Sequence, residues 1–415
     1  MTDEVTTAVT GHIFILVCGN NIADAERART QARLLSARGH RVTLAAPRAL
    51  QGPPIATADG AVNLQTLDGD LLQSPAEPML RVIKTHTCVI SAVLRASLGA
   101  DAADVVQLSG PASRLFPAAL AARLTGRPVV TDVRGLTADT YATTSPVLRP
   151  GRIRSLAFLD QMALRSSDLA VISDRQLAAA GGAARSVLLR ERAFDGLTPR
   201  EGARERFANG RPHLVASFSD FDAGDPVNVL LRTVRRVVFG LERTDVQFAI
   251  AAPRAQHGAL AQMAQADDVT AFITLVDAQD HDALSQLLSV SDALVDPAMP
   301  DMRSAGSISA FALSGAKFGV PLVAFERASV HERLGTSSIM AREPQVPALA
   351  DSLLDLLDFP EELAAKKRAA RESFASDASF EREADAYCEA IAQLLARKVR
   401  PSHDVMSHPS EATAE

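Results

Sequence analysis

The sequence has little cysteine for its length. Its three cysteines, Cys18, Cys88 and Cys388, are odd in number, far apart and without neighbouring histidines. This pattern argues against both a disulfide framework and a structural zinc site, and it fits a reducing cytoplasm. Of the nine histidines, only His403 and His408 lie close together, and they belong to a polar tail. We therefore expect no metal site.

Long apolar runs are also missing. No segment approaches the about 20 consecutive apolar residues that a membrane-spanning helix needs. The first ten residues include two acids and no apolar run, so no secretory signal is expected. These absences predict a cytoplasmic protein, with peripheral contact at the inner face of the cell membrane as a further expectation.

The chain also lacks a strong charge of either sign. Its formal net charge is -6, with 47% hydrophobic and 22% charged residues. Such a balance produces no overall attraction to nucleic acid or acidic lipid, so any basic surface must be local. At roughly 100 to 200 residues per domain, the 415 residues predict two domains with sizeable cores.

What the sequence does contain is a repeated alternation of apolar strands and amphipathic helices. The first set of strands is expected at 12–18, 41–46, 104–108, 127–132 and 168–173. The second set is expected at 213–218, 245–251, 271–276, 292–296 and 320–325. Helices with a period of 3.6 residues fill the intervals, and this order predicts parallel sheets. The predicted fold class is therefore α/β, with two tandem Rossmann-like domains facing across a cleft.

The same pattern sets the expected domain boundaries. The order along the chain is a disordered N-terminus (1–10), an acceptor-side domain (11–190), a linker (191–211), a donor-side domain (212–378), a C-terminal helix that packs back on the first domain (379–398) and a disordered tail (399–415). The linker is placed at "RERAFDGLTPREGARERFANGR" because this stretch is charged, lacks strand periodicity and contains Gly and Pro.

Several stretches resemble family 4 glycosyltransferases of the GT-B fold. They are "ERARTQARLLSARGHRVTLAAP", "PVVTDVRGLTAD", "LDQMALRSSDLAVIS", "SGAKFGVPLVAF" and "FASDASFEREADAYCEAIAQLL". The resemblance covers nearly the whole chain. It implies transfer of a sugar from a nucleotide-sugar donor to a glycan or lipid-linked acceptor, in envelope polysaccharide or glycoconjugate assembly, without a metal or cofactor.

The donor side departs from that family's pattern. The resemblance implies two glutamates eight positions apart, but Gly306 and Ser314 stand there. It also implies an Arg and a Lys for the diphosphate, but the nearest equivalents are Ser217 and Asp225. Between Ser304 and Phe325 the only ionisable side chain is Lys317.

A rewired donor site could be formed by the turn "PDMRSAGSIS". Arg303 supplies a cation, and the backbone amides around Ser304, Gly306 and Ser307 open a helix that can face an anion. A capped helix with a surface arginine explains the same residues. Asp222, in "DFDAGDP", has two readings as well: a cleft-lining acid or part of a solvated turn.

On the acceptor side, the loop after the first strand contains Gly19, Asn20 and Asn21, which line the cleft or simply form a strand-to-helix turn. Arg134 and Asp139 follow another strand, where open parallel sheets bind ligands, and an internal salt bridge is the alternative. Gln107 ends a strand at a place where the resemblance implies a histidine. Its amide can orient a hydroxyl but cannot act as a base.

The segment "RPGRIRSLAFLDQMALR" is locally basic. Arg149, Arg152, Arg154 and Arg165 surround apolar residues, which fits either contact with anionic lipid or the solvated face of a domain helix.

Three functions fit these patterns. The first is an active glycosyltransferase, and the second is an inactive GT-B subunit that binds or scaffolds a partner glycosyltransferase. The third is a sugar-nucleotide epimerase, for which no acid and base pair is recognisable. No partner nucleic acid is expected.

Overall fold

The protein is described by a computed structural model. The residues described are 10–19, 21–52, 54–57, 60–67, 79–139, 150–173, 185–220, 226–299, 308–377 and 379–399. The expected disorder of the two ends therefore falls almost entirely outside the described residues. Within these residues, none of the helices combines the length and the apolar character needed to cross a bilayer.

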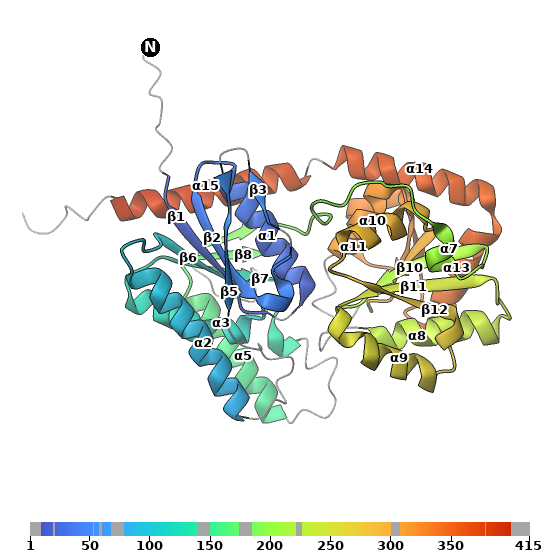
Figure 1. The fold of residues 1–415 in the computed structure, drawn as a ribbon, viewed down its shortest axis with the longest axis horizontal. Helices are drawn as coiled ribbons and strands as arrows, with labels where there is room; N and C mark the ends of the chain where they lie inside the picture. Colours follow the sequence, from blue (N-terminus) through green and yellow to red (C-terminus); the bar gives the residue numbers. More distant parts are fainter. Residues whose placement is uncertain are drawn as a thin grey trace, which may run out of the picture.

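The N-terminal sheet has seven parallel strands in the order β5-β2-β1-β6-β7-β8-β9 (Figure 1). In chain order they are β1 (His12–Val17), β2 (Arg41–Pro47), β5 (Asn63–Leu67), β6 (Val105–Ser109), β7 (Val129–Val133), β8 (Leu169–Ile172) and β9 (Ser186–Leu188). A short antiparallel pair, β3 (Ala56–Thr57) and β4 (Gly60–Ala61), lies between β2 and β5 in the chain. The helices are α1 (Ile22–Ser36), α2 (Met79–Leu98), α3 (Ala112–Leu124) and α5 (Pro150–Arg165).

The C-terminal sheet has six strands in the order β12-β11-β10-β13-β14-β15, and all its pairings are parallel. Its strands are β10 (His213–Phe218), β11 (Val246–Ala252), β12 (Ile273–Asp277), β13 (Ala293–Asp296), β14 (Leu322–Phe325) and β15 (Ser338–Ala341). Its helices are α7 (Arg204–Ala208), α8 (Val227–Arg235), α9 (His257–Ala266), α10 (His281–Val290), α11 (Ala310–Phe318), α12 (Ala328–Leu334), α13 (Val346–Asp358) and α14 (Pro360–Ser376). The predicted class of two Rossmann-like α/β domains is confirmed.

Side-chain alternation along each central strand builds a core on both faces of the sheet. In β1, Phe14 and Leu16 point to the layer of α2, α3 and α5, while Ile13 and Ile15 point to the layer of α1 and α15 (Ser379–Val399). This follows from the two-residue period of a strand, because a parallel sheet is covered by helices on both faces. Figure 1 shows α15 lying along the N-terminal domain, whereas the preceding helix α14 lies on the C-terminal domain.

The chain crosses between the domains twice. Phe194, Leu197 and Phe207 already pack into the core of the C-terminal domain, so the first crossing is shorter than the 191–211 linker expected from the sequence. The apolar residues inside this charged stretch account for the difference. After the second crossing, Tyr387 and Ile391 of α15 are buried against the N-terminal sheet.

Helix α11, which lies within the charge-poor stretch from Ser304 to Phe325, has clear boundaries. Ser309 caps its start by accepting a hydrogen bond from the backbone N–H of Ala312 at 3.1 Å. Gly319 ends it with a φ of 77°, a conformation that glycine adopts without strain, and Pro321 follows two residues later. The helix therefore leads immediately into β14.

Candidate functional site

The carboxyl ends of the two sheets meet at the domain interface. Ile22, which opens α1 after β1, donates its backbone N–H to Asp220 Oδ1 at 3.2 Å, and Asp220 follows β10. Ile22 and Ala25 also pack in the same hydrophobic cluster as the C-terminal core. Ligands of open parallel sheets bind beyond these carboxyl ends, so the interface is the candidate site.

The loop after β1 is close-packed rather than open. A Cβ on Gly19 would lie 2.2 Å from Asp24 Oδ2, and a Cβ on Gly110 would lie 2.7 Å from the Gly19 nitrogen. Asn21 caps α1, because its Oδ1 accepts from the Asp24 N–H at 2.7 Å. The structure thus places Gly19 and Asn21 at the interface edge as packing and capping residues.

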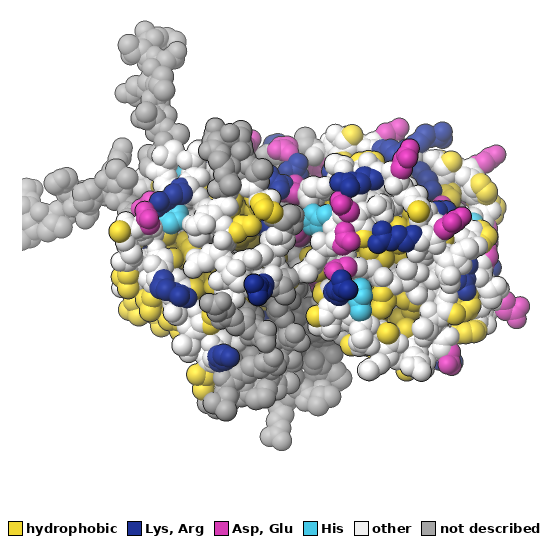
Figure 2. Space-filling model, in the orientation of Figure 1, with side chains coloured by type: hydrophobic (Ala, Val, Ile, Leu, Met, Phe, Trp, Pro, Cys, Tyr) yellow, Lys and Arg dark blue, Asp and Glu magenta, His cyan; other side chains and the backbone are white. Residues whose placement is uncertain are grey.

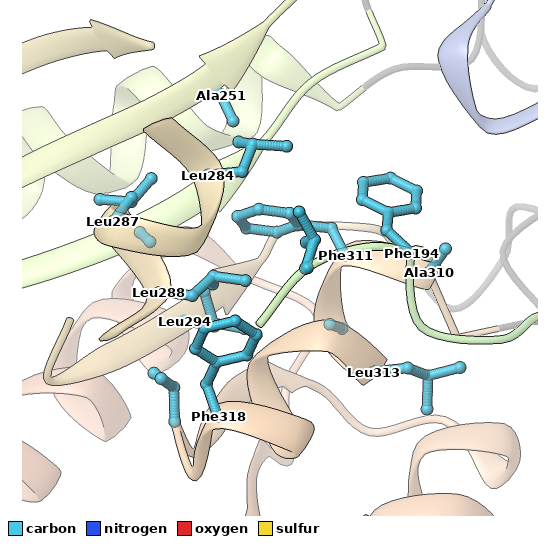
Figure 3. Close-up of a cluster of buried hydrophobic side chains, with 14 of the residues drawn as sticks. Phe194, Ala251, Leu284, Leu287, Leu288, Leu294, Ala310, Phe311, Leu313 and Phe318 are labelled. Atoms are coloured by element: carbon cyan, nitrogen blue, oxygen red, sulfur yellow. The ribbon is translucent and has the colours of Figure 1, made fainter. Parts of the chain in front are cut away.

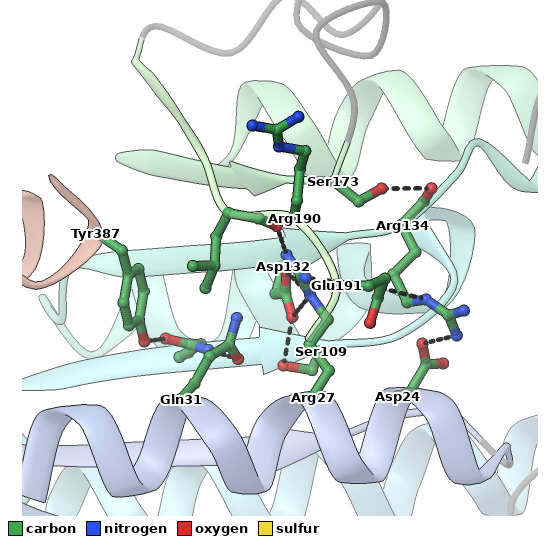
Figure 4. Close-up of polar contacts among 12 residues, drawn as sticks. Asp24, Arg27, Gln31, Ser109, Asp132, Arg134, Ser173, Arg190, Glu191 and Tyr387 are labelled. Atoms are coloured by element: carbon green, nitrogen blue, oxygen red, sulfur yellow. Dashed lines mark hydrogen bonds and ion pairs between the residues drawn. The ribbon is translucent and has the colours of Figure 1, made fainter. Parts of the chain in front are cut away.

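Beneath this loop lies a buried ion network (Figure 4). Arg27 Nε lies 2.9 Å from both carboxylate oxygens of Asp132, and Arg27 Nη1 lies 3.6 Å from Glu191 Oε1. Arg27 Nη2 also donates to the Leu189 carbonyl at 2.6 Å. Burial would lower the pKa of Arg27, but the two carboxylates outweigh it and raise that pKa. The network ties α1 and β7 to the segment that crosses to the second domain.

Arg134 joins the network from the carboxyl end of β7. Its Nε donates to Glu191 Oε1 at 3.0 Å and its Nη1 to Asp24 Oδ1 at 3.3 Å. Burial opposes its charge, yet Glu191 and Asp24 raise the pKa of Arg134 well above the usual range. Its side chain remains 27% exposed, so it can still meet a ligand. Asp139, half-buried, lies further along the same loop.

Gln107 has a different environment from the one expected of a substrate contact. It is completely buried in β6, where its amide donates to Gln31 Oε1 at 2.7 Å and its carbonyl accepts from the Tyr387 hydroxyl at 2.7 Å. These bonds hold α15 on the sheet. We therefore assign Gln107 a structural role, because a substrate hydroxyl cannot reach it.

On the donor side, two expected site residues belong to the core. Ser314 is completely buried; its hydroxyl accepts from the Phe194 N–H at 2.8 Å and donates to the Ala310 carbonyl at 2.8 Å. Ser217 is 1% exposed and donates to the Val295 carbonyl at 2.8 Å. Both hydroxyls serve the folded chain, so neither replaces the charge that the family resemblance implies at its position.

Three phenylalanine rings pack together where the crossing segment enters the C-terminal domain. The ring centroids of Phe218 and Phe311 are 5.3 Å apart and stacked, and those of Phe194 and Phe218 are 5.8 Å apart, edge to face. Figure 3 shows Phe194 and Phe311 within the buried apolar cluster of the C-terminal domain. The crossing segment is therefore anchored in the C-terminal domain by aromatic packing.

The remaining donor-side candidates fall outside the described residues: Arg303, Ser304, Gly306, Ser307 and Asp222, together with Asp225 and, on the acceptor side, Asn20. They stay predictions from the sequence.

Several charged residues near the carboxyl edges of the two sheets were not predicted from the sequence. Arg27 and Glu191 form the network described above, and Arg327, after β14, donates from Nη2 to Asp296 Oδ2 at 2.6 Å. A signal for Arg27 was present: with Gln31 it forms an i, i+4 pair beside Ala28 and Ala32 on the buried face of α1. Polar side chains among small apolar ones on an inward face indicate a buried network.

Comparisons with known proteins agree with this architecture. Residues 25–187, less than half of the chain, match the family model described as "Glycosyl transferase 4-like domain". No curated protein sequence matches the chain. Among solved structures, sucrose-phosphate synthase from Thermosynechococcus elongatus is similar with a TM-score of 0.68 and 13% identity, over 93% of this chain and 100% of that one.

Two further structures are similar across nearly their whole length. Anabaena Alr3699/HepE in complex with UDP and glucose has a TM-score of 0.63 and 12% identity, covering 92% of this chain and 100% of that one. A UDP-N-acetylglucosamine 2-epimerase has a TM-score of 0.54 and 12% identity, covering 95% and 99%. At these identities the likeness shows the GT-B fold alone, because transferases and an epimerase share it.

Proposed function

We propose that this chain, which carries a glycosyltransferase 4-like domain in a GT-B fold, transfers a sugar from a nucleotide-sugar donor to a glycan or lipid-linked acceptor. The observation that carries the proposal is the meeting of the two carboxyl edges, marked by the bond from Ile22 N–H to Asp220. HepE, which has this fold, was solved with UDP and glucose. A donor on one edge and an acceptor on the other would face each other here.

Sugar transfer requires the chain to stabilise the leaving diphosphate and to accept a proton from the acceptor hydroxyl. The bond between the sugar C1 and the diphosphate oxygen breaks, so cations or N–H groups must stabilise the departing diphosphate. An acceptor hydroxyl attacks C1, so a base must take its proton. Arg134 is our candidate for the diphosphate within the described residues, with Arg303 as the second cation, and Asp139 is our candidate for the base.

The proposal includes three finer points. The reaction proceeds without a metal, it belongs to envelope polysaccharide or glycoconjugate assembly, and it takes place in the cytoplasm at the inner face of the membrane. These points rest on the family resemblance and on the acceptor class that it implies. Donor hydrolysis that persists in excess EDTA would support the first point, and a strict need for added Mg²⁺ would contradict it.

Calorimetric titration with UDP and GDP tests the donor assignment. We expect saturable binding by the wild type. Arg303→Ala and Arg134→Gln should each weaken it by about 1.5 to 3 kcal/mol, the usual worth of a hydrogen bond to a charged group. Arg41→Ala is the matched control, because Arg41 lies at the amino end of β2 and pairs with Asp101. Equal affinity of all four proteins would remove both arginines from the site.

A second function is favoured by the two serines. Because Ser217 and Ser314 are buried and bonded within the core, neither can supply the charge that the resemblance implies at its position. A GT-B subunit without donor binding, serving as the partner of an active glycosyltransferase, would have this property. It predicts no nucleotide binding in the titration and co-purification with a transferase whose activity depends on this chain. An epimerase would instead convert a UDP-sugar without any acceptor.

A further inference from the structure

One layer of the N-terminal domain has a charge opposite to that of the whole chain. Helices α2, α3 and α5 contain eight arginines and lysines and a single acid, Asp160, which is buried. The chain as a whole has a net charge of -6. Six of the basic side chains are exposed: Lys84, Arg95, Arg123, Arg152, Arg154 and Arg165. Among the described residues, none of these six pairs with a carboxylate.

The exposed apolar side chains gather on the same helices. Of the seven large hydrophobic residues that are exposed in the described chain, five lie here: Ile83, Leu98, Leu120, Leu124 and Phe158. Leu124 is 79% exposed and Phe158 is 61% exposed. Isolated exposed leucines are ordinary, but a group of them among basic residues indicates an interaction surface.

The three helices present these residues on one surface. Helix α3 packs against both α2 and α5, and all three bury their inner sides, with Val93, Leu115 and Leu164, against the sheet. Leu120 and Leu124, and likewise Arg154 and Phe158, are four residues apart and so lie on one side of their helices. We call the outer surface of α2, α3 and α5 the basic face.

The figures agree with this arrangement. In Figure 1 the three helices form the lower left layer, away from the C-terminal domain. In Figure 2 the described atoms over this region are yellow, dark blue and white, whereas acidic side chains appear at the upper edge and over the other domain.

We propose that the basic face binds the anionic surface of a lipid bilayer. Lysine and arginine are attracted to acidic headgroups, and leucine and phenylalanine enter the boundary between headgroups and acyl chains. Nucleic acid would use the cations but not the aliphatic side chains. The proposal is independent of the transferase assignment, because an inactive subunit with this face would bind the membrane equally.

Vesicle flotation tests the proposal. We use vesicles of phosphatidylglycerol and phosphatidylcholine in equal parts, and vesicles of phosphatidylcholine alone. The wild type should float with the anionic vesicles at low salt, and binding should weaken steeply as NaCl rises because screening shortens the reach of surface charge. The neutral vesicles should bind at least tenfold more weakly.

Two variants separate the contributions. Arg152→Glu with Arg154→Glu removes positive charge, and Leu124→Ser with Phe158→Ser removes apolar contact; each pair should weaken binding tenfold or more. The matched controls lie on the C-terminal domain: Arg232→Glu with Arg254→Glu, and Phe239→Ser, all at exposed positions. Unchanged thermal unfolding of each variant confirms that it is folded.

The outcomes are decisive in both directions. Loss of flotation in the two basic-face variants, with retention in both controls, supports the proposal. Absence of wild-type flotation, equal loss in the control variants, or equal binding to neutral vesicles overturns it. Binding of the wild type to RNA or to another protein, impaired by the same arginine changes while anionic vesicles are ignored, would assign the face to that partner instead.

Discussion

The two carboxyl edges that meet at the interface have different chemistry. On the N-terminal side, Arg27, Asp132 and Glu191 form a buried network that joins a helix, a strand and the crossing segment. On the C-terminal side, Ser314 and the neighbouring phenyl rings hold the same crossing segment through a neutral hydrogen bond and aromatic packing. The crossing segment is thus held by buried ion pairs on the N-terminal side and by neutral, largely aromatic contacts on the C-terminal side.

The comparison shows why charges at a sheet edge are weak indicators of a ligand site. Most charged side chains on the N-terminal edge are already paired with one another. Of Arg27 and Arg134, only Arg134 keeps a substantially exposed side chain. The serines on the C-terminal edge are equally committed to the fold. An anionic donor would therefore depend on Arg134 and on residues outside the described ones.

The largest loss of unfolding free energy is expected when the buried ion network on the N-terminal side is broken. Arg27→Met keeps most of the side-chain length but leaves Asp132 and Glu191 buried without their cation. Removing one partner from a buried pair commonly lowers the free energy of unfolding by about 3 to 5 kcal/mol. Urea denaturation should show this loss. Arg41→Met is the control, because its pair with Asp101 is exposed on both sides and should contribute less than about 1 kcal/mol. Equal small losses would mean that the network is not essential.

The fold was largely predictable because its signals are local. The apolar run of β1, the helical spacing of α1 and the Gly319-Val320-Pro321 turn each identify an element from a few residues. Strands β9 and β15 were missed because they are short and lie at sheet edges, where burial is partial. Apolar residues such as Phe207 within a charged stretch concealed the true extent of the second domain.

The site was less predictable because its contacts are long-range. Glu191 meets Arg27 across more than 160 positions, and Gln107 meets Tyr387 across 280. No local pattern distinguishes a strand-end polar residue that faces a ligand from one that binds another element. Family position alone also misleads at Ser314, since a serine with a structural hydrogen bond has no sequence signature.

The next largest effect is the pH dependence of the unfolding free energy, which should have opposite signs for two buried aspartates, Asp160 and Asp292. Asp160, in the N-terminal domain, accepts from the Ala138 N–H at 2.9 Å, but burial raises its pKa to about 6 from 3.8. The folded state then holds this proton more tightly than the unfolded state. Asp160 should stabilise the fold below pH 3.8, and this stability should be lost as the pH rises through about 6. The shift corresponds to about 3 kcal/mol.

Asp292, in the C-terminal domain, provides the opposite case. Burial raises its pKa, but hydrogen bonds from Arg204 and from the Leu214 N–H prevail and lower it. Its contribution should be present above pH 3.8 and lost as the pH falls. Unfolding free energies of the wild type, Asp160→Asn and Asp292→Asn at pH 3, below the ordinary aspartate pKa of 3.8, and at pH 7 test both signs. Relative to the wild type, Asp160→Asn should gain stability on going to pH 7 and Asp292→Asn should lose it; parallel shifts would contradict the comparison.

A smaller loss of unfolding free energy is expected when the neutral hydrogen bond of Ser314 on the C-terminal side is removed. Ser314→Ala removes the acceptor of the buried Phe194 N–H, and an unsatisfied buried donor costs about 1 to 3 kcal/mol. Ser291→Ala is the matched control, because Ser291 is also buried and its hydroxyl donates to the Leu287 carbonyl of its own helix. Chemical denaturation should show a larger loss for Ser314. Ser314→Glu should be more harmful than Ser314→Ala, because the carboxylate would be buried, and tighter nucleotide binding by that variant than by the wild type would refute the structural role.

The smallest effect concerns the residue that ties the crossing segment to both domains. Arg190 Nε lies 2.6 Å from Glu383 Oε1 on α15, and its backbone N–H donates to Glu383 Oε2 at 2.8 Å. Arg190 Nη1 lies 2.6 Å from Glu332 Oε1 on α12 of the other domain. The Glu332 side chain is 66% exposed, whereas that of Glu383 is 12% exposed. Solvent screens the Arg190–Glu332 pair more strongly than the Arg190–Glu383 pair. Glu332→Ala should therefore lower the free energy of unfolding by less than about 0.5 kcal/mol, and Glu383→Ala should lower it by about 1 kcal/mol. Each glutamate variant is compared with its double mutant carrying Arg190→Ala, and a coupling energy that is larger for Glu332 than for Glu383 would show that the crossing segment is held chiefly by the C-terminal domain.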